Sequence, residues 1–114
     1  MKKIAVVADI HANRYALEEF MKYINKENIE IILNMGDFVQ IGPNPFEVSE
    51  IILKDKRFIN ILGNNEISLF DIDNKEKNEE INHRKWTKQQ LHKNFETIKS
   101  IPQKRIINID GKNI

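Results

Sequence analysis

The chain has 114 residues, of which 40% are hydrophobic and 31% charged, which is typical of one globular domain and not of a disordered or fibrous chain. Its 18 Lys and Arg residues nearly balance its 17 Asp and Glu residues, so there is no global positive field that would favour nucleic-acid binding. The absence of cysteine excludes disulfides and thiolate metal sites, which leaves Asp, Glu, His, Asn and backbone oxygens as metal ligands.

The first predicted element is the short apolar run Ile4 to Ala8, which favours a strand buried on both faces of a parallel sheet. Asp9 interrupts this run, and no stretch approaches the roughly 20 apolar residues of a membrane span, so we expect a cytoplasmic protein that does not bind a membrane. Asn13 can cap a following helix. The apolar face of that helix would consist of Ala16, Leu17, Phe20, Met21 and Ile24.

The alternation of strand and helix then repeats. Residues 29–33 and 57–62 are predicted strands, and residues 46–54 form an amphipathic helix between them. Strands that alternate with helices predict an α/β fold with a mostly parallel sheet and flanking helices. In such sheets ligands bind at the carboxyl ends of the strands.

The last third of the chain is more polar. Residues 71–80 read as a solvated loop or an exposed helix start, and residues 82–100 as one helix ending before Pro102. Its buried side would carry Trp86, Leu91, Phe95 and Ile98. Residues 105–109 are a predicted fourth strand, and Asp110-Gly111 is a hairpin signal only three residues before the end. We therefore expect residues 1–114 to be a single domain that is truncated at its carboxyl end.

Polar residues follow each of the first three predicted strands: Asp9 with His11, then Asp37, then Asn64. Each alone would most often be a turn former or a helix cap. If the strands are adjacent and parallel, however, two carboxylates, an imidazole and an amide oxygen meet at one edge of the sheet. This donor set predicts a site for a hard or borderline divalent cation.

The same positions resemble the signature blocks of a known family, the calcineurin-like metallophosphoesterases. The matching blocks are Asp9-Ile10-His11, Gly36-Asp37 with Gly42-Pro43 after it, and Gly63-Asn64-Asn65-Glu66. A small prokaryotic phosphodiesterase group within the family is similar in the turn from Gly42 to Pro45 and in the segment from Trp86-Thr87 to Pro102.

The resemblance implies that the chain is the N-terminal half of a four-layer α/β sandwich in which two sheets pack face to face. It implies hydrolysis of phosphate mono- or diesters at a pair of divalent cations such as Mn²⁺, which activate water and clamp the phosphate oxygens. Asp9 and His11 would bind the first cation, Asp37 would bridge both, and Asn64 would bind the second.

Two departures from the family pattern affect this expectation. Asn65 stands where the family has a catalytic histidine, and an amide can donate a hydrogen bond but cannot deliver a proton at neutral pH. The later Gly-His and Gly-His-x-His blocks of the family have no counterpart, since His83 and His92 fall in the predicted long helix and are expected on its surface. We therefore expect one weakly bound cation or none, and little turnover by this chain alone.

Two alternatives remain open. One is a non-catalytic fragment or binding module that keeps the fold and at most one weak metal or phosphate site. The other is a plain flavodoxin-like domain whose strand-end acids only form turns. The expected partners are a phosphate-ester substrate and a second copy of the chain, bound through an exposed sheet face or through the edge of the last strand, residues 105–109.

Overall fold

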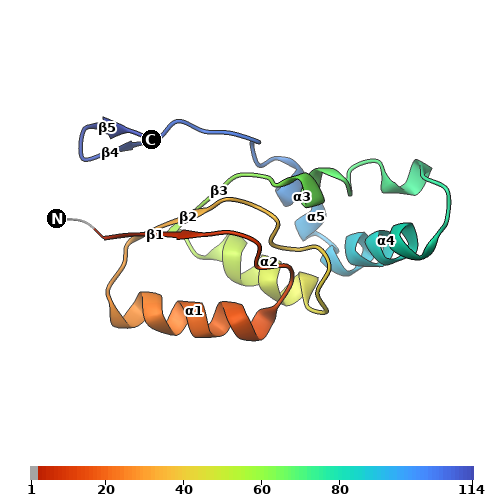
Figure 1. Cartoon of the computed structure of the whole chain (residues 1–114), viewed down its shortest axis with the longest axis horizontal. Coiled ribbons are helices and arrows are strands. Elements are labelled where there is room, and N and C mark those ends of the chain that lie inside the picture. Colours follow the sequence, from red (N-terminus) through yellow and green to blue (C-terminus); the bar gives the residue numbers. More distant parts are fainter. Residues whose placement is uncertain (1–2) are drawn as a thin grey trace.

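The computed structural model describes residues 3–114 as an α/β fold built on a three-stranded parallel sheet of order β1-β2-β3 (Figure 1). In chain order the elements are β1 (Ile4–Val7), α1 (Arg14–Lys26), β2 (Ile31–Asn34), α2 (Pro45–Lys54), β3 (Phe58–Asn60), α3 (Asn64–Ile67), the 3₁₀ helix η1 (Ile72–Asn74), α4 (Glu79–Leu91), α5 (Asn94–Lys99), β4 (Asn108–Ile109) and β5 (Lys112–Asn113). None of the helices in this described range is long and apolar enough to cross a membrane.

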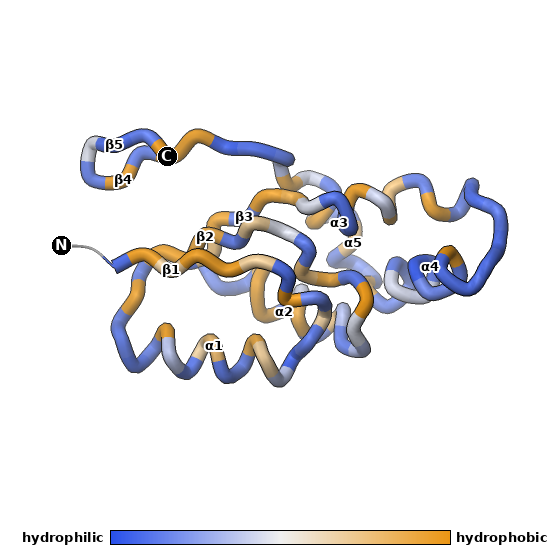
Figure 2. The backbone as a smooth tube through the Cα atoms, in the orientation of Figure 1, coloured by the Kyte–Doolittle hydropathy of each residue, from blue (hydrophilic) through white to orange (hydrophobic). Residues whose placement is uncertain are grey.

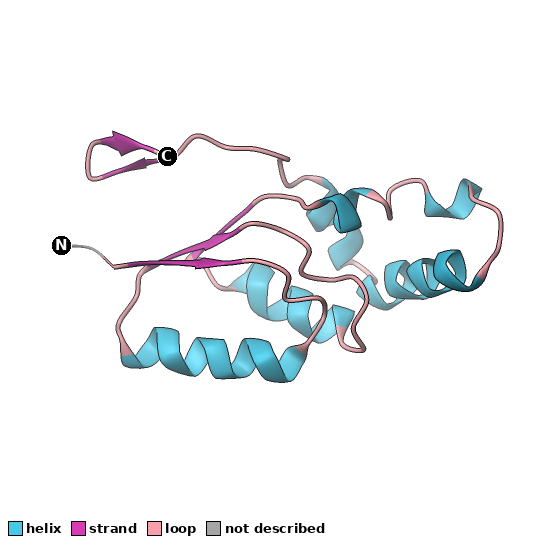
Figure 3. Cartoon of the chain, in the orientation of Figure 1, coloured by secondary structure: helices cyan, strands magenta, loops and turns pink. Residues whose placement is uncertain are grey.

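The sheet confirms the predicted adjacency of the first three strands. Ile4 of β1 lies opposite Ile31 of β2, and Ile32 lies opposite Phe58 of β3, both in parallel register. The second strand begins at Ile31 and not at residue 29 as predicted. The three strands therefore end at the same edge of the sheet, and the chain leaves that edge in three loops (Figure 3).

The hydrophobic core lies between the sheet and the two helices that cover it. Ile32 of the central strand is fully buried and packs in one cluster with Leu17 and Ile24 of α1 and with Val48 and Ile52 of α2. Hydrophobic residues accordingly concentrate in the strands, while α4 is mostly hydrophilic (Figure 2). Burial on this scale is the main force that holds α1 and α2 against the sheet.

The other face of the sheet is apolar and only partly covered. A depression of about 290 Å³ there is lined mainly by Leu33, Ile59 and Ile61 of the sheet region and by Ile107 and Ile114 of the terminal segment. The hairpin formed by β4 and β5 lies on this side, away from α1 and α2 (Figure 1).

The predicted single helix over residues 82–100 is wrong, because the structure divides this segment into α4 and α5. The division falls at His92, whose φ of 50° and ψ of −127° are not helical. This break turns α5 so that Phe95 and Ile98 enter the core. Trp86 was expected on the buried side but is 38% exposed, whereas Leu91 is fully buried as predicted.

The predicted fourth strand, residues 105–109, does not join the parallel sheet. Asn108 and Ile109 pair instead with Asn113 and Lys112 of the antiparallel β5, around the turn at Asp110 and Gly111. Ile107 and Ile114 extend this pairing by two backbone hydrogen bonds of 3.0 and 2.8 Å. Both turn residues have positive φ, 51° and 84°, as a two-residue hairpin turn requires. The hairpin signal was thus correct, and its strands pair with each other because the turn brings them together locally.

The start of β3 is held by an ion pair that makes a testable pH-dependent contribution to stability. Arg57 donates two side-chain hydrogen bonds to Asp55, at 3.0 and 2.7 Å, and lowers the pKa of that carboxyl below its ordinary 3.8. A depressed pKa means that ionised Asp55 stabilises the fold above its unfolded-state pKa and that this gain is lost as the pH falls through the folded-state value.

We expect Asp55→Asn to reduce the free energy of unfolding by about 1 kcal/mol at pH 7. The difference from wild type should shrink below about pH 4, where the unfolded carboxyl becomes protonated. Urea unfolding of the wild type and of Asp55→Asn at pH 7 and pH 3 measures this difference in unfolding free energy. A difference that is the same at both pH values would show that the ion pair does not act through its charge.

Candidate metal centre

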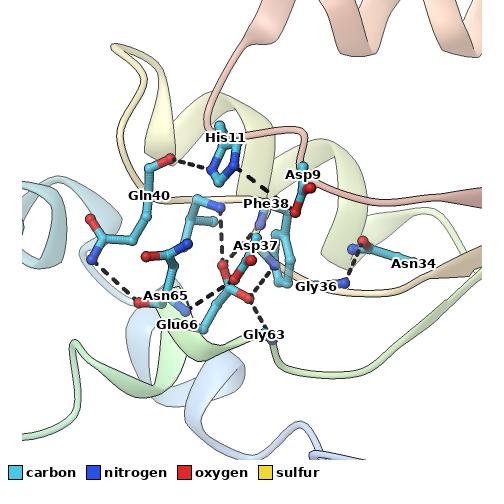
Figure 4. A network of polar contacts seen from close by, with 11 residues as sticks. Asp9, His11, Asn34, Gly36, Asp37, Phe38, Gln40, Gly63, Asn65 and Glu66 are labelled. Carbon is cyan, nitrogen blue, oxygen red and sulfur yellow. Dashed lines mark hydrogen bonds and ion pairs between the residues drawn. The ribbon is translucent and has the colours of Figure 1, made fainter.

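Two loops run side by side at the carboxyl edge of the sheet and carry three of the predicted ligands. The loop after β1 donates backbone hydrogen bonds to the loop after β2, from Asp9 N to Gly36 O at 3.1 Å and from His11 N to Asp37 O at 3.0 Å. Asp9, His11 and Asp37 therefore lie close together (Figure 4). The pairing of the two strands is thereby extended beyond their ends. Residues far apart in the sequence are fixed beside each other, as the parallel sheet predicts.

Asp9 and His11 lie next to each other and are reached by solvent. His11 Nε2 is 4.0 Å from Asp9 Oδ1, and the two side chains are 32% and 66% exposed, His11 being the less exposed. His11 Nδ1 lies 3.2 Å from the main-chain oxygen of Gln40, which can only accept a hydrogen bond. The hydrogen of the neutral ring is therefore on Nδ1, which leaves Nε2 free to bind a cation.

Asp37 connects these loops to the third one. Its Oδ1 accepts a hydrogen bond of 3.0 Å from the backbone N–H of Asn65. Asn64 is the first residue of α3 and is exposed, and Asn65 is half-buried. The structure thus brings Asp9, His11 and Asp37 onto adjacent loops and places Asn64 beside them at the start of the helix.

The contact between the second and third loops leaves no space for side chains on its two glycines. A Cβ on Gly36 would lie 2.4 Å from Gly63 N, and a Cβ on Gly63 would lie 2.1 Å from Asp37 Oδ1. Gly36 also has a φ of 105°, which is unfavourable for any residue with a side chain. The glycines of the two blocks therefore allow the main chain to approach the Asp37 carboxylate.

Strained backbone is concentrated in the first two loops. Their residues Asp9, His11, Ala12, Asp37 and Ile41 all have positive φ, between 50° and 86°. Non-glycine residues adopt this region at a cost and keep it only where the surroundings impose it. Such strain clusters at functional sites in proteins, which agrees with the position of these loops.

The buried carboxylate of Glu66 holds the second and third loops together. Glu66 has no exposed surface and accepts hydrogen bonds from Asp37 N (2.7 Å), Phe38 N (2.8 Å) and Gly63 N (2.9 Å), with a longer one from Val39 N (3.4 Å). Burial raises the pKa of this carboxyl, and the N–H donors oppose that shift. Glu66 contributes position and not reactivity, because its oxygens are occupied by main-chain donors.

The sequence assigned no role to Glu66 beyond membership of the third block. The signal that could have identified it is the spacing from Gly63, since an acid three residues after a helix cap often bonds back to the cap N–H. Its contacts to residues 37–39 could not have been found in this way, because they join segments 27 to 29 residues apart.

Gln40 is a second residue that the sequence did not single out. It is 1% exposed, and its Nε2 donates to Asn65 O at 3.3 Å and to Ser68 Oγ at 3.2 Å. Its main-chain oxygen binds His11, so one residue connects the imidazole to α3. Its buried Oε1 has no hydrogen-bond partner in the described part of the chain.

Two buried asparagines, Asn34 and Asn60, stabilise the turn at Gly36. Asn34 Nδ2 donates to Asn60 Oδ1 at 3.0 Å, and Asn34 Oδ1 accepts from Gly36 N at 3.2 Å. Arg105 Nε donates to Asn60 O at 2.8 Å, which anchors the terminal segment to the same strand. These buried amide groups at the ends of β2 and β3 thus find hydrogen-bond partners within the protein.

The donor chemistry fits a divalent cation, but the side chains do not form a closed site. Two carboxylates and an imidazole with free Nε2 suit Mn²⁺ or a related ion. Within residues 3–114, however, no group of three or more His, Asp or Glu side chains is arranged to hold a metal ion. The role of Asp9, His11, Asp37 and Asn64 as ligands, and that of Asn65 in catalysis, stay predictions.

Comparison with known proteins identifies what this arrangement resembles. The family described as calcineurin-like phosphoesterase matches residues 2–114. The uncharacterized protein MJ0912 of Methanocaldococcus jannaschii is 32% identical over 97% of this chain and 46% of its own length. The crystal structure of a metallophosphoesterase from Sphaerobacter thermophilus covers 94% of this chain, with a TM-score of 0.73 and 26% identity, and 44% of that protein is matched. The chain therefore spans less than half the length of these relatives.

Proposed function

The chain belongs to the calcineurin-like phosphoesterase family, and on this premise we propose that its three loops form part of a divalent-metal site for the hydrolysis of phosphate esters. The site residues of this proposal are Asp9, His11, Asp37 and Asn64, with Mn²⁺ as the cation. The observation that carries it is the coupling of the loops: His11 N bonds Asp37 O at 3.0 Å, and Asn65 N bonds Asp37 Oδ1 at 3.0 Å.

Each residue would contribute position or charge. The Gln40 carbonyl holds the His11 ring with Nε2 toward Asp9, and the Asn65 N–H and Glu66 hold the Asp37 loop. A bound cation would activate water and neutralise charge on the phosphate. Asp9 and Asp37 provide the negative charge that attracts such a cation to this edge of the sheet.

The Asn65 side chain supports a second candidate function, a binding module with little turnover. Its amide can donate a hydrogen bond to a phosphate or leaving-group oxygen, but it cannot protonate a leaving group. Loss of a general acid lowers a rate by about 100-fold to 10,000-fold. A chain with Asp9, His11 and Asp37 in place and Asn65 beside them would bind a metal and a phosphate group while hydrolysing the ester slowly.

A thermal melt with and without Mn²⁺ tests metal binding. We expect Mn²⁺ at ten times its dissociation constant to stabilise the wild type by about 1.4 kcal/mol, which raises Tm by several degrees. Asp37→Asn should lose this gain, because it removes one of the two carboxylate charges. The matched control is Glu30→Gln, which removes an exposed charge just before β2, at the opposite end of the sheet from the loops. Equal stabilisation of Asp37→Asn and the wild type would contradict the proposed site.

Hydrolysis of an aryl phosphodiester, measured on the same proteins, separates the two candidate functions. The wild type should hydrolyse it slowly, Asp37→Asn should not, and Asn65→His should gain up to about 100-fold if only the acid is missing. No gain in Asn65→His, with metal binding intact, favours the binding module. Hydrolysis by the wild type at rates typical of enzymes would contradict the expectation that this chain alone has little activity.

A further inference from the structure

A second recess lies next to the candidate metal centre and has different chemistry. It has a volume of about 360 Å³ and is lined by Ile41, Gly42, Pro43, His83 and Trp86. We propose that this aromatic pocket binds a flat aromatic ring in the alcohol or phenol part of a phosphate ester whose phosphoryl group lies at the metal centre. The inference rests on the proposed function and adds to it the class of substrate.

The pocket and the metal centre share one loop. Gly42 packs directly on the main chain of His11, since a Cβ on Gly42 would lie 2.1 Å from His11 O. Gln40, whose main-chain oxygen binds the His11 ring, immediately precedes Ile41. The loop that orients the imidazole therefore continues as one wall of the pocket, so that a group esterified to a phosphate beside His11 has a short path into it.

The opposite wall comes from α4, which packs against α2 beyond the carboxyl ends of the strands (Figure 1). The His83 and Trp86 rings are stacked, with centroids 5.5 Å apart and an interplanar angle of 24°. His83 Nε2 lies 3.0 Å from Ile41 O, which fixes the imidazole and joins the two walls.

The chemistry of the pocket favours the flat face of an aromatic ring. Its lining contains no acidic side chain, lysine or arginine, and it offers two stacked rings against an isoleucine and a proline. Trp86 remains 38% exposed and Ile41 61% exposed, so both present uncovered apolar surface to a ligand. An aromatic ring stacked on Trp86 and covered by Ile41 would remove that surface from water.

The backbone at Ile41 is also strained. Its φ is 86°, a region that a β-branched residue adopts only under constraint. The contact of His83 Nε2 with the Ile41 carbonyl oxygen is made at this strained residue. Strain of this kind persists at ligand-contacting positions.

Trp86 is the only tryptophan of the sequence, so intrinsic fluorescence reports on this pocket directly. The probes are phenylphosphonate, its ring-free counterpart methylphosphonate, and adenosine, which has a ring system but no phosphate. We expect saturable changes in the emission of Trp86 with phenylphosphonate and adenosine and none with methylphosphonate. The absence of a saturable change with the two ring-bearing probes at millimolar concentration would overturn the proposal, and so would an equal response to methylphosphonate.

Variants test the walls without damaging the fold. Ile41→Gly removes one wall and relieves the strained φ, so it should weaken adenosine binding by about tenfold without lowering Tm. His83→Ala should weaken it similarly. The matched control is His92→Ala, which removes a histidine at the end of the same helix whose ring contacts Phe46 at 5.6 Å and which is not part of the pocket lining. Equal affinity in Ile41→Gly and in the wild type would overturn the proposal.

Asp37→Asn separates this inference from the proposed function. The adenosine response should survive in Asp37→Asn, because the pocket does not include that carboxylate. If the wild type gives the adenosine response but neither binds Mn²⁺ nor hydrolyses an ester, the pocket binds aromatic rings and the proposed enzymatic function is wrong. Conversely, hydrolysis of alkyl and aryl esters with equal kcat/KM would support the enzyme and overturn the aromatic pocket.

Discussion

Gly36→Ala is expected to lower the free energy of unfolding by about 3 kcal/mol, because the added methyl group enters occupied space in a backbone conformation that alanine disfavours. Its Cβ would lie 2.4 Å from Gly63 N and 2.7 Å from Gly63 Cα, and both are main-chain atoms that cannot rotate away. The φ of 105° adds strain. The loops that carry Asp37 and Asn64 would have to separate, so the stabilisation by Mn²⁺ should be lost with the stability.

The matched control for this substitution is Gly111→Ala. Gly111 also has positive φ, 84°, but a Cβ there would meet no atom within 4 Å. Gly111→Ala should therefore lower the free energy of unfolding only by the cost of the strained backbone conformation, about 1 kcal/mol. Urea unfolding of both variants measures the difference, which isolates the close contact between the loops. If Gly36→Ala is no more destabilising than Gly111→Ala, the loops are not packed as described.

Glu66→Gln is the second substitution with a large expected effect, again about 3 kcal/mol. The carboxylate accepts from Asp37 N at 2.7 Å, Phe38 N at 2.8 Å and Gly63 N at 2.9 Å. Glutamine keeps one acceptor oxygen, but its NH₂ group would face backbone N–H groups that need an acceptor. At least one buried donor then loses its partner, which is more costly than the loss of an ordinary surface hydrogen bond.

Two measurements distinguish a positioning role for Glu66 from simple packing. Unfolding in urea gives the stability, with Glu30→Gln as the exposed control. The Mn²⁺-dependent shift in Tm gives the affinity, which should fall by about 10-fold to 100-fold because the Asp37 loop is no longer held. A destabilised variant that retains full Mn²⁺ affinity would show that Glu66 supports the fold without positioning the loop.

The part of the fold that could be predicted from sequence is the part with strong local patterns. The apolar runs that form β1 and β2 are separated by a helix with one apolar face, and this order predicts parallel neighbours. Polar residues after parallel strands must then reach one edge, so local patterns alone suffice to predict Asp9, His11 and Asp37 on adjacent loops, where they lie. The Asp110-Gly111 hairpin is equally local, since its turn conformation depends on two residues.

Other features were decided by contacts between distant segments. The helix break at His92 has no proline or glycine to mark it, and it follows from the packing of Phe95 and Ile98 into the core. Residues 105–109 were predicted to be a fourth strand, but which sheet would contain it depends on long-range contacts. The structure keeps this segment out of the parallel sheet, and the local turn brings residues 107 and 114 within hydrogen-bond distance.

The sequence by itself determined the α/β class, the parallel adjacency of the three strands and the family, because these follow from local periodicity and short motifs. Only the tertiary structure decided how the candidate site is held: Glu66 binds main-chain groups up to 29 residues away, and Gln40 orients His11 across the same distance. The aromatic pocket likewise depends on a contact between Ile41 and His83, 42 residues apart. Periodicity reports which face of an element is apolar, but hydrogen bonds between loops depend on the register in which whole elements pack, and no local pattern encodes that register.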